Sequence, residues 1–172
     1  MIKTITSPRF LFVGTLILMA AVSRLLPHPD NFTPIAAMAL FGGAHLSRRY
    51  AMLLPILALL ISDIFLGFHS SIWAVYLSMA IIAGIGMLIA KNQNIATVFG
   101  ATLIGSILFF LITNFAVWFG TPYYPQNAAG LIACYEAGIP FFRNTMLGDL
   151  CYSGILFGSY YFAKQKFPQL AA

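Results

Sequence analysis

Residues 95–119 read IATVFGATLIGSILFFLITNFAVWF, a run of 25 residues without a charged side chain. An α-helix needs about 20 apolar residues to cross a hydrocarbon core of about 30 Å, so this run predicts a membrane-spanning helix. The whole chain has the same character, because 60% of its 172 residues are hydrophobic and 8% are charged. Ordinary soluble domains are about 25% charged. The sequence therefore predicts an integral membrane protein.

Five further apolar runs flank this one, at about 10–26, 33–47, 51–68, 72–90 and 145–163. Because these runs take up nearly the whole chain, we expect residues 1–172 to form one domain, an all-α bundle of six transmembrane helices. The longest segment between spans, residues 120–144, is expected to be a loop between the fifth and sixth helices. Its residues 128–137 have the pattern of a short helix lying at the membrane interface.

Local signals mark helix starts and close packing. Thr33 followed by Pro34 is typical of an N-cap and first helical residue, and further caps are expected at Ser70 or Ser71, Asn94 and Asn144. Small residues four positions apart let helices pack closely in a membrane, and they occur at Ala39 and Gly43, Ala80 and Gly84, and Gly154 and Gly158, among others. Packing within the bundle explains such pairs, and contact with a partner subunit is the alternative.

The basic residues indicate the orientation. With the N-terminus inside, only Arg24 and Arg143 of the nine Lys and Arg lie outside, and the inner side holds Lys3, Arg9, Arg48, Arg49, Lys91, Lys164 and Lys166. This bias predicts a multi-pass protein with both termini in the cytoplasm. A cleaved signal peptide is an alternative for the first span, although its apolar run is long for that role. The basic residues form no stripe, so nucleic acid is not an expected partner.

Two of the four acidic residues, Asp63 and Asp149, lie inside apolar runs. A charge facing lipid at the centre of a span costs about 3 kcal/mol or more, so such acids usually face a protein interior and have a function. At about 1.5 Å per residue, Asp63 is expected about 9 Å, Asn114 about 8 Å and Asp149 about 6–9 Å below the outer ends of their spans. Their shared depth predicts an outward-facing polar pocket beneath the loops.

Arg24, Arg143 and Asn144 are expected at the same level. Arg143 is the stronger candidate for an anion contact, because a guanidinium can hold a carboxylate or phosphate through two hydrogen bonds. The alternative is that Asp63 and Asp149 pair with the two arginines only to hold helix ends together, although buried ion pairs are poor stabilisers.

Other reactive residues form no recognisable site. His28 and His69 both fall on the outer side, but two histidines without a third ligand do not predict a metal site. Cys134 and Cys151 have neither a redox nor a zinc spacing, and nothing in the sequence determines whether they form a disulfide. Nucleophile-elbow, metalloprotease and phosphate-loop motifs are absent, and Ser153 has no histidine in a later span to activate it. We therefore expect no enzyme, no metal and no cofactor.

Several segments together resemble the substrate-binding S components of energy-coupling-factor (ECF) vitamin transporters. They are Asn31 to Pro34 leading into Leu40 to Ala44, Ser62 and Asp63 with Leu66 to His69, Thr113 to Trp118, and Ile139 to Asp149. The likeness covers almost the whole chain. More narrowly, the chain is similar to a group of small bacterial integral membrane proteins related to S components, whose motifs do not specify a substrate. It implies an S-component-like six-helix fold in the bacterial cytoplasmic membrane.

The resemblance also implies a function. The chain would bind a small water-soluble micronutrient, such as a vitamin or cofactor precursor, from outside, and would work with an ECF transmembrane subunit and two ATPases. The implied substrate-binding residues are Asp63, Asn114, Arg143, Asn144 and Asp149, with Arg24, His69, Phe32 and Trp118 beside them. The A-x-x-x-A docking pattern of S components is replaced by Gly14 and Leu18 in the first span, so a transporter that works alone is also open.

One solitary type of S component takes up cobalamin and binds its cobalt through a thiol, and Cys134 lies on the expected outer loop. No motif connects Cys134 with that role. Two other functions remain open from the sequence: an ion- or proton-coupled solute carrier that uses Asp63 and Asp149, and a structural membrane subunit without a ligand. The apolar inner half of the spans argues against the carrier.

Overall fold

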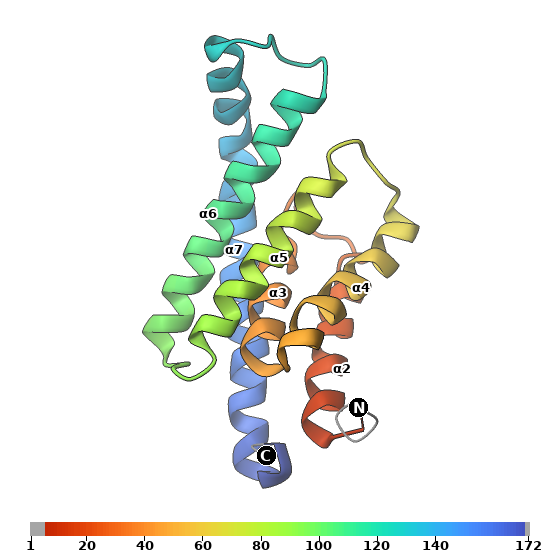
Figure 1. Ribbon diagram of the computed structural model, residues 1–172, viewed down its shortest axis with the longest axis vertical. Helices are drawn as coiled ribbons and strands as arrows, with labels where there is room; N and C mark the ends of the chain where they lie inside the picture. The colour runs from red at the N-terminus through yellow and green to blue at the C-terminus, as the bar shows by residue number, and fades with distance from the viewer. Residues whose placement is uncertain (1–5, 171–172) are drawn as a thin grey trace.

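The computed structural model describes residues 6–170, and all regular secondary structure in this part of the chain is helical (Figure 1). The helices are α2 (Pro8–Ser23), α3 (Ile35–His45), α4 (Arg48–Leu66), α5 (Ile72–Ile89), α6 (Ile95–Gly120) and α7 (Ala128–Lys166), followed by the short 3₁₀ helix η1 (Pro168–Leu170). The predicted all-α architecture is therefore confirmed for the described residues. Lys3, one of the residues used to orient the chain, lies outside them.

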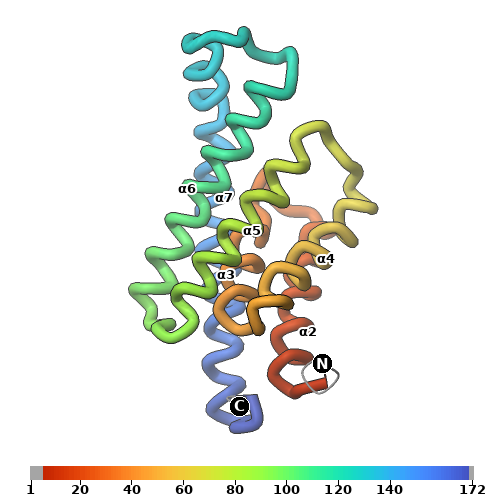
Figure 2. Tube along the Cα trace, in the orientation of Figure 1, coloured from red at the N-terminus to blue at the C-terminus, as the bar shows by residue number. Residues whose placement is uncertain are grey.

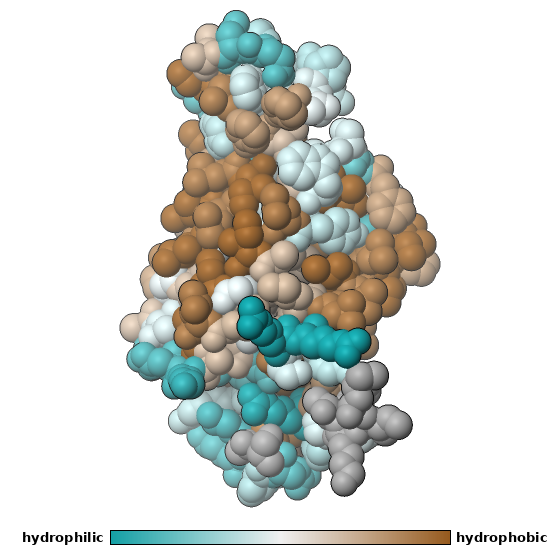
Figure 3. Space-filling view, viewed as in Figure 1, coloured by the Kyte–Doolittle hydropathy of each residue, from teal (hydrophilic) through white to brown (hydrophobic). Residues whose placement is uncertain are grey.

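Three helices, α4, α5 and α6, are long and apolar enough to cross a membrane by length and composition. Helices α2 and α3 are apolar but shorter. Successive helices run up and down, so the α2–α3, α4–α5 and α6–α7 connections all face the same end of the molecule, the loop end (Figure 2). The start of α2 and the end of η1 lie at the opposite end, the termini end, where hydrophilic side chains border a broad apolar surface (Figure 3).

Helix α3 is the centre of the bundle. All 11 of its residues are buried, and it packs against α2, α4, α5, α6 and α7. Its small side chains permit this, because a Cβ added to Gly43 would lie 2.1 Å from the Ala83 carbonyl oxygen of α5. In the reverse direction, a Cβ on Gly86 would lie 2.2 Å from the carbonyl oxygen of Leu40. The predicted small-residue position Gly84 instead faces open space.

The prediction for residues 120–163 was wrong in its boundaries. Helix α7 begins at Ala128 and continues for 39 residues through Pro140, so residues 128–137 are its first turns and not a separate interfacial helix. Asn127 caps it by accepting a hydrogen bond from the Gly130 N–H at 2.9 Å, and Asn144 is an interior residue. At about 1.5 Å per residue α7 is about 58 Å long. The α6–α7 hairpin therefore projects beyond the other connections at the loop end.

The remaining caps were predicted with mixed success. Asn94 caps α6 by accepting a hydrogen bond from the Thr97 N–H at 2.8 Å, as predicted. Ser71 occupies the N-cap position of α5 without a side-chain hydrogen bond. Helix α3 begins one residue later than predicted, with Pro34 at its N-cap, and Pro34 has no side-chain acceptor to offer the first turn. The N–H groups in the first turn of α3 therefore receive no acceptor from the N-cap side chain.

Candidate functional site

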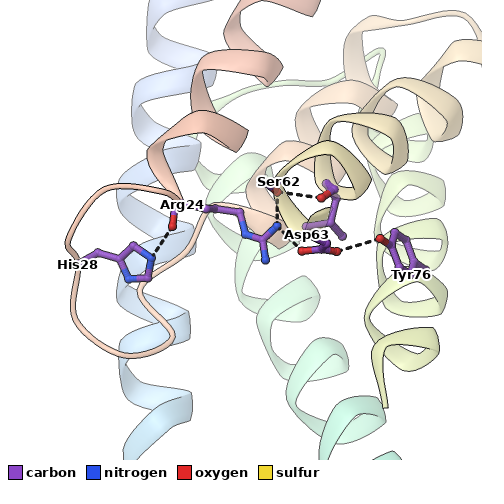
Figure 4. A network of polar contacts seen from close by, with 6 residues as sticks. Arg24, His28, Ser62, Asp63 and Tyr76 are labelled. Carbon is purple, nitrogen blue, oxygen red and sulfur yellow. Dashed lines mark hydrogen bonds and ion pairs between the residues drawn. The ribbon is translucent and has the colours of Figure 1, made fainter. Parts of the chain in front are cut away.

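Asp63 lies in a polar network that joins three helices (Figure 4). Arg24, which ends α2, donates from Nη1 to the Asp63 Oδ1 at 2.8 Å and also to the hydroxyl of Ser62. Tyr76 of α5 donates its hydroxyl proton to the Asp63 Oδ2 at 2.8 Å. Both carboxylate oxygens are thus occupied, and the Arg24 and Asp63 side chains are only 11% and 5% exposed. The pairing of Asp63 with Arg24, which the sequence left as an alternative to a ligand pocket, is present.

We predict that Tyr76→Phe lowers the free energy of unfolding by about 1–2 kcal/mol, because it removes one hydrogen bond to a charged acceptor. Thermal unfolding of the purified protein in detergent measures this change. Tyr123→Phe is the matched control, since Tyr123 is 77% exposed at the loop end. Equal unfolding temperatures for the two variants would show that the Tyr76 hydroxyl contributes nothing to the network.

Asp149 is 1% exposed and contacts no cation among the described residues. Its Oδ2 accepts a hydrogen bond from the Ser106 hydroxyl at 2.8 Å, and its Oδ1 accepts one from the backbone N–H of Ala37 at 3.2 Å. Ala37 is in the first turn of α3, where N–H groups have no partner within the helix. Asp149 of α7 therefore supplies the acceptor that Pro34 lacks, and the positive end of the α3 dipole offsets its charge. The alternative pairing of Asp149 with Arg143 is wrong.

Hydroxyl groups continue from Asp149 along the seam between α6 and α7. The Thr102 and Ser153 hydroxyl groups are hydrogen-bonded, with their oxygens 2.9 Å apart. This pair lies one helical turn nearer the termini end than Ser106 and Asp149. The sequence reasoning missed Thr102 and Ser106. A signal was present, because Thr102 and Ser106, like Asp149 and Ser153, are four residues apart and so share a helix face.

A cavity of about 350 Å³ lies at the loop end, between α5, α6 and α7. The α2–α3 and α4–α5 connections each contribute to its lining, through Asn31 and through His69. Of the predicted substrate-binding residues, Asn114 and His69 line it. Its other polar and aromatic lining includes Thr113, Phe110, Phe142 and Thr145. Among the lining residues within 6–170, none is Asp, Glu, Lys or Arg.

The remaining predicted site residues lie elsewhere. Arg143 is exposed, and Asn144 donates a side-chain hydrogen bond to the Asp30 carbonyl oxygen at 2.9 Å, which attaches α7 to the α2–α3 connection. The Trp118 Nε1 donates to the Pro125 carbonyl oxygen at 2.9 Å and so supports the α6–α7 turn. The Phe32 ring packs against Tyr152 with centroids 6.1 Å apart. None of these residues lines the loop-end cavity in the described part of the chain.

The cysteines and histidines form no metal site. Cys134 and Cys151 are free thiols, and residues 6–170 contain no group of three His, Cys, Asp or Glu side chains that could hold a metal ion. Cys134 is 2% exposed and lies against the Asn114 carbonyl oxygen of α6 at 3.4 Å. A thiol in this position is shielded from a ligand in the cavity.

Comparison with known proteins shows the family to which the chain belongs. No curated protein sequence and no solved structure matches the chain. A family model, described as a family of unknown function (DUF6580), matches residues 4–170. Since this match covers nearly the whole sequence, the chain belongs to the DUF6580 family.

Proposed function

We propose that this protein binds a small water-soluble solute in the loop-end cavity and takes part in its uptake across a membrane. The observation that supports this most is the cavity of about 350 Å³, which combines aromatic walls with Asn114, Thr113 and Thr145. This mixture of apolar walls and a few convergent polar groups is typical of small-molecule sites, whose volumes are about 300–1,000 Å³. Asn31 and His69 from two connections form its rim.

The proposal includes six membrane-embedded helices with the loop end facing outward. Arg9, Arg48, Lys91, Lys164 and Lys166 lie at or next to helix ends at the termini end, which is the arrangement expected when that end is cytoplasmic. Arg143 and Lys164 are separated on α7 by about 32 Å, at about 1.5 Å per residue, which matches the hydrocarbon thickness of about 30 Å. In this orientation the cavity opens to the outside.

An S-component-like protein would need a partner to supply energy, because the chain contains no phosphate loop. The ECF transmembrane subunit and ATPases are the proposed partners. Docking through α2 would differ from the usual pattern, since Gly14 is buried and its missing Cβ would lie 3.4 Å from Leu54 of α4. A partner would have to use another surface, or the protein would work alone.

We predict that Asn114→Ala weakens solute binding at least tenfold, because the loss of its amide removes a polar contact in the cavity. The measurement is a thermal-shift screen of vitamins and cofactor precursors against the purified protein, followed by calorimetry on the best ligand. Gly100→Ala on the same helix is the control, since a Cβ there meets nothing within 4 Å. A screen in which no compound shifts the unfolding temperature would contradict the proposal.

A second candidate, a proton-coupled carrier, is supported by the α6–α7 seam. Asp149 and Ser106 lie between the loop-end cavity and a second cavity of about 840 Å³ near the termini end, whose lining includes Thr102 and Ser153. A carboxylate without a cation partner between two cavities is a candidate proton site. Solute-dependent proton flux in liposomes that disappears in Asp149→Asn would favour this function. Uptake that is independent of a pH gradient would exclude it.

A further inference from the structure

We propose that the solute of the loop-end cavity is an uncharged planar heterocycle or carboxamide that donates hydrogen bonds. This inference rests on the proposed function and names the substrate class of the same cavity. It follows from three properties of the lining: the absence of a charged partner for a ligand, the aromatic walls, and the direction in which the polar groups already donate their protons.

The charges near the cavity are used elsewhere. Asp63 is paired with Arg24 and Tyr76, and Asp149 accepts from Ser106 and from the first turn of α3. Arg143 is exposed and does not line the cavity. A carboxylate or phosphate entering this space would lose hydration and meet no counter-charge, which disfavours binding of an ion. The expectation of an anion held by Arg143 is therefore replaced by an uncharged solute.

Only one titratable side chain, that of His69, is found among the lining residues in the described chain. It is exposed at the rim, and its Nδ1 lies 3.1 Å from the Ser71 hydroxyl.

The walls favour a planar ligand. The Phe110 and Phe142 rings line the cavity with centroids 4.7 Å apart and an interplanar angle of 37°. Phe109 lies beside them. Aromatic rings of this kind pack well against another planar π system.

The polar groups of the lining favour a ligand that donates. Thr113 donates its hydroxyl proton to the Phe109 carbonyl oxygen at 2.7 Å, and Thr145 donates to that of Phe141 at 3.1 Å. Asn114 donates from Nδ2 to the Phe110 carbonyl oxygen at 2.9 Å, and no hydrogen bond to its Oδ1 is found within the described residues. These three side chains offer acceptor lone pairs to the cavity, which a solute with N–H or O–H donors can satisfy.

Gly138 provides space for the Asn114 amide. A Cβ at position 138 would lie 2.5 Å from the Asn114 Oδ1 and 2.9 Å from the Phe110 ring. Gly138→Ala therefore displaces the proposed acceptor and is expected to weaken binding at least tenfold. Gly154→Ala is the matched control on the same helix, because its added Cβ meets nothing within 4 Å. Asn114→Ala provides a second test if Gly138→Ala does not fold.

The experiment measures binding of three sets of probes to the full-length protein in nanodiscs at pH 8. Nicotinamide and uracil are uncharged donors, nicotinate and orotate are their anionic counterparts, and N,N-dimethylnicotinamide and 1,3-dimethyluracil lack the N–H donors. We expect an uncharged donor to bind at least tenfold more tightly than its anionic and methylated counterparts, and this preference to be lost in Gly138→Ala.

The substrate class would be overturned if an anion bound more tightly than its uncharged counterpart, or if a methylated compound bound equally well. If that binding were also weakened by Asn114→Ala, the proposed function would still stand. Absence of binding by every probe, charged or uncharged, would overturn both. The two proposals are therefore distinguished by which probes bind and not by the loss of binding alone.

Discussion

Gly43→Ala is expected to prevent the bundle from assembling. The added methyl would lie 2.1 Å from the Ala83 carbonyl oxygen and 2.9 Å from the Gly86 Cα, so it meets the backbone of α5 and not a flexible side chain. Overpacking a buried site typically costs about 1–3 kcal/mol and occasionally more. A contact with rigid backbone at the centre of the bundle should cost about 3 kcal/mol or more. We therefore expect almost no monodisperse protein on size exclusion in detergent.

Two further variants sharpen this prediction. Gly86→Ala approaches the Leu40 carbonyl oxygen to 2.2 Å from the opposite side and should have the same effect. Gly84→Ala, two residues away on α5, meets nothing within 4 Å and should fold normally. If Gly43→Ala and Gly84→Ala gave the same yield and unfolding temperature, the close crossing of α3 and α5 would be wrong.

Asp149→Leu is expected to destabilise the protein by about 2–5 kcal/mol. The substitution leaves the Ala37 N–H without its acceptor in a buried site and removes an acceptor of the Ser106 hydroxyl. Each buried unsatisfied polar group costs about 1–3 kcal/mol. Unfolding by SDS or heat measures the change, and α3 should lose amide protection first in hydrogen exchange because its first turn depends on this acceptor.

Asp149→Asn is the matched control for that substitution. An asparagine oxygen can still accept from the Ala37 N–H, and Asn is about as good a helix cap as Asp. Its amide can donate to the Ser106 oxygen, because Ser106 also contacts the Thr102 carbonyl oxygen at 3.1 Å. We expect Asp149→Asn to lose less than about 1.5 kcal/mol. A loss equal to that of Asp149→Leu would show that the charge itself, and not the acceptor, stabilises α3.

The sequence reasoning agrees with the structure where a residue's position follows from its depth in a span. It placed Asp63 and Arg24 at the same level and left their pairing as an alternative, and they lie 2.8 Å apart. It also selected Asn114 and His69, which line the cavity. These predictions needed only helix rise, residue type and the order of the spans, all of which are local properties of the chain.

The same reasoning failed for Asp149 and for the start of α7. Counting charges suggested Arg143 as the partner of Asp149, but its partners are a hydroxyl and the backbone N–H of Ala37. Every residue except proline has a backbone N–H donor, so no sequence pattern marks which donors a helix terminus will leave free. Asn144 is a residue type that often caps helices, yet the N-cap of α7 is Asn127. Helix α7 packs against α6 and extends through Pro140, so Asn144 lies inside the helix.

The sequence by itself determined that this is a helical protein with membrane-type helices. Hydrophobic content and the length of apolar runs depend only on consecutive residues, so they can be read without the fold. Residues 95–119, the run that decides this class, form most of α6. The tertiary structure alone decided that Gly43 meets Gly86 and Ala83, that Asp149 caps α3, and that neither Asp63 nor Asp149 lines the loop-end cavity. These depend on which faces of distant helices meet, and that is determined by packing in three dimensions.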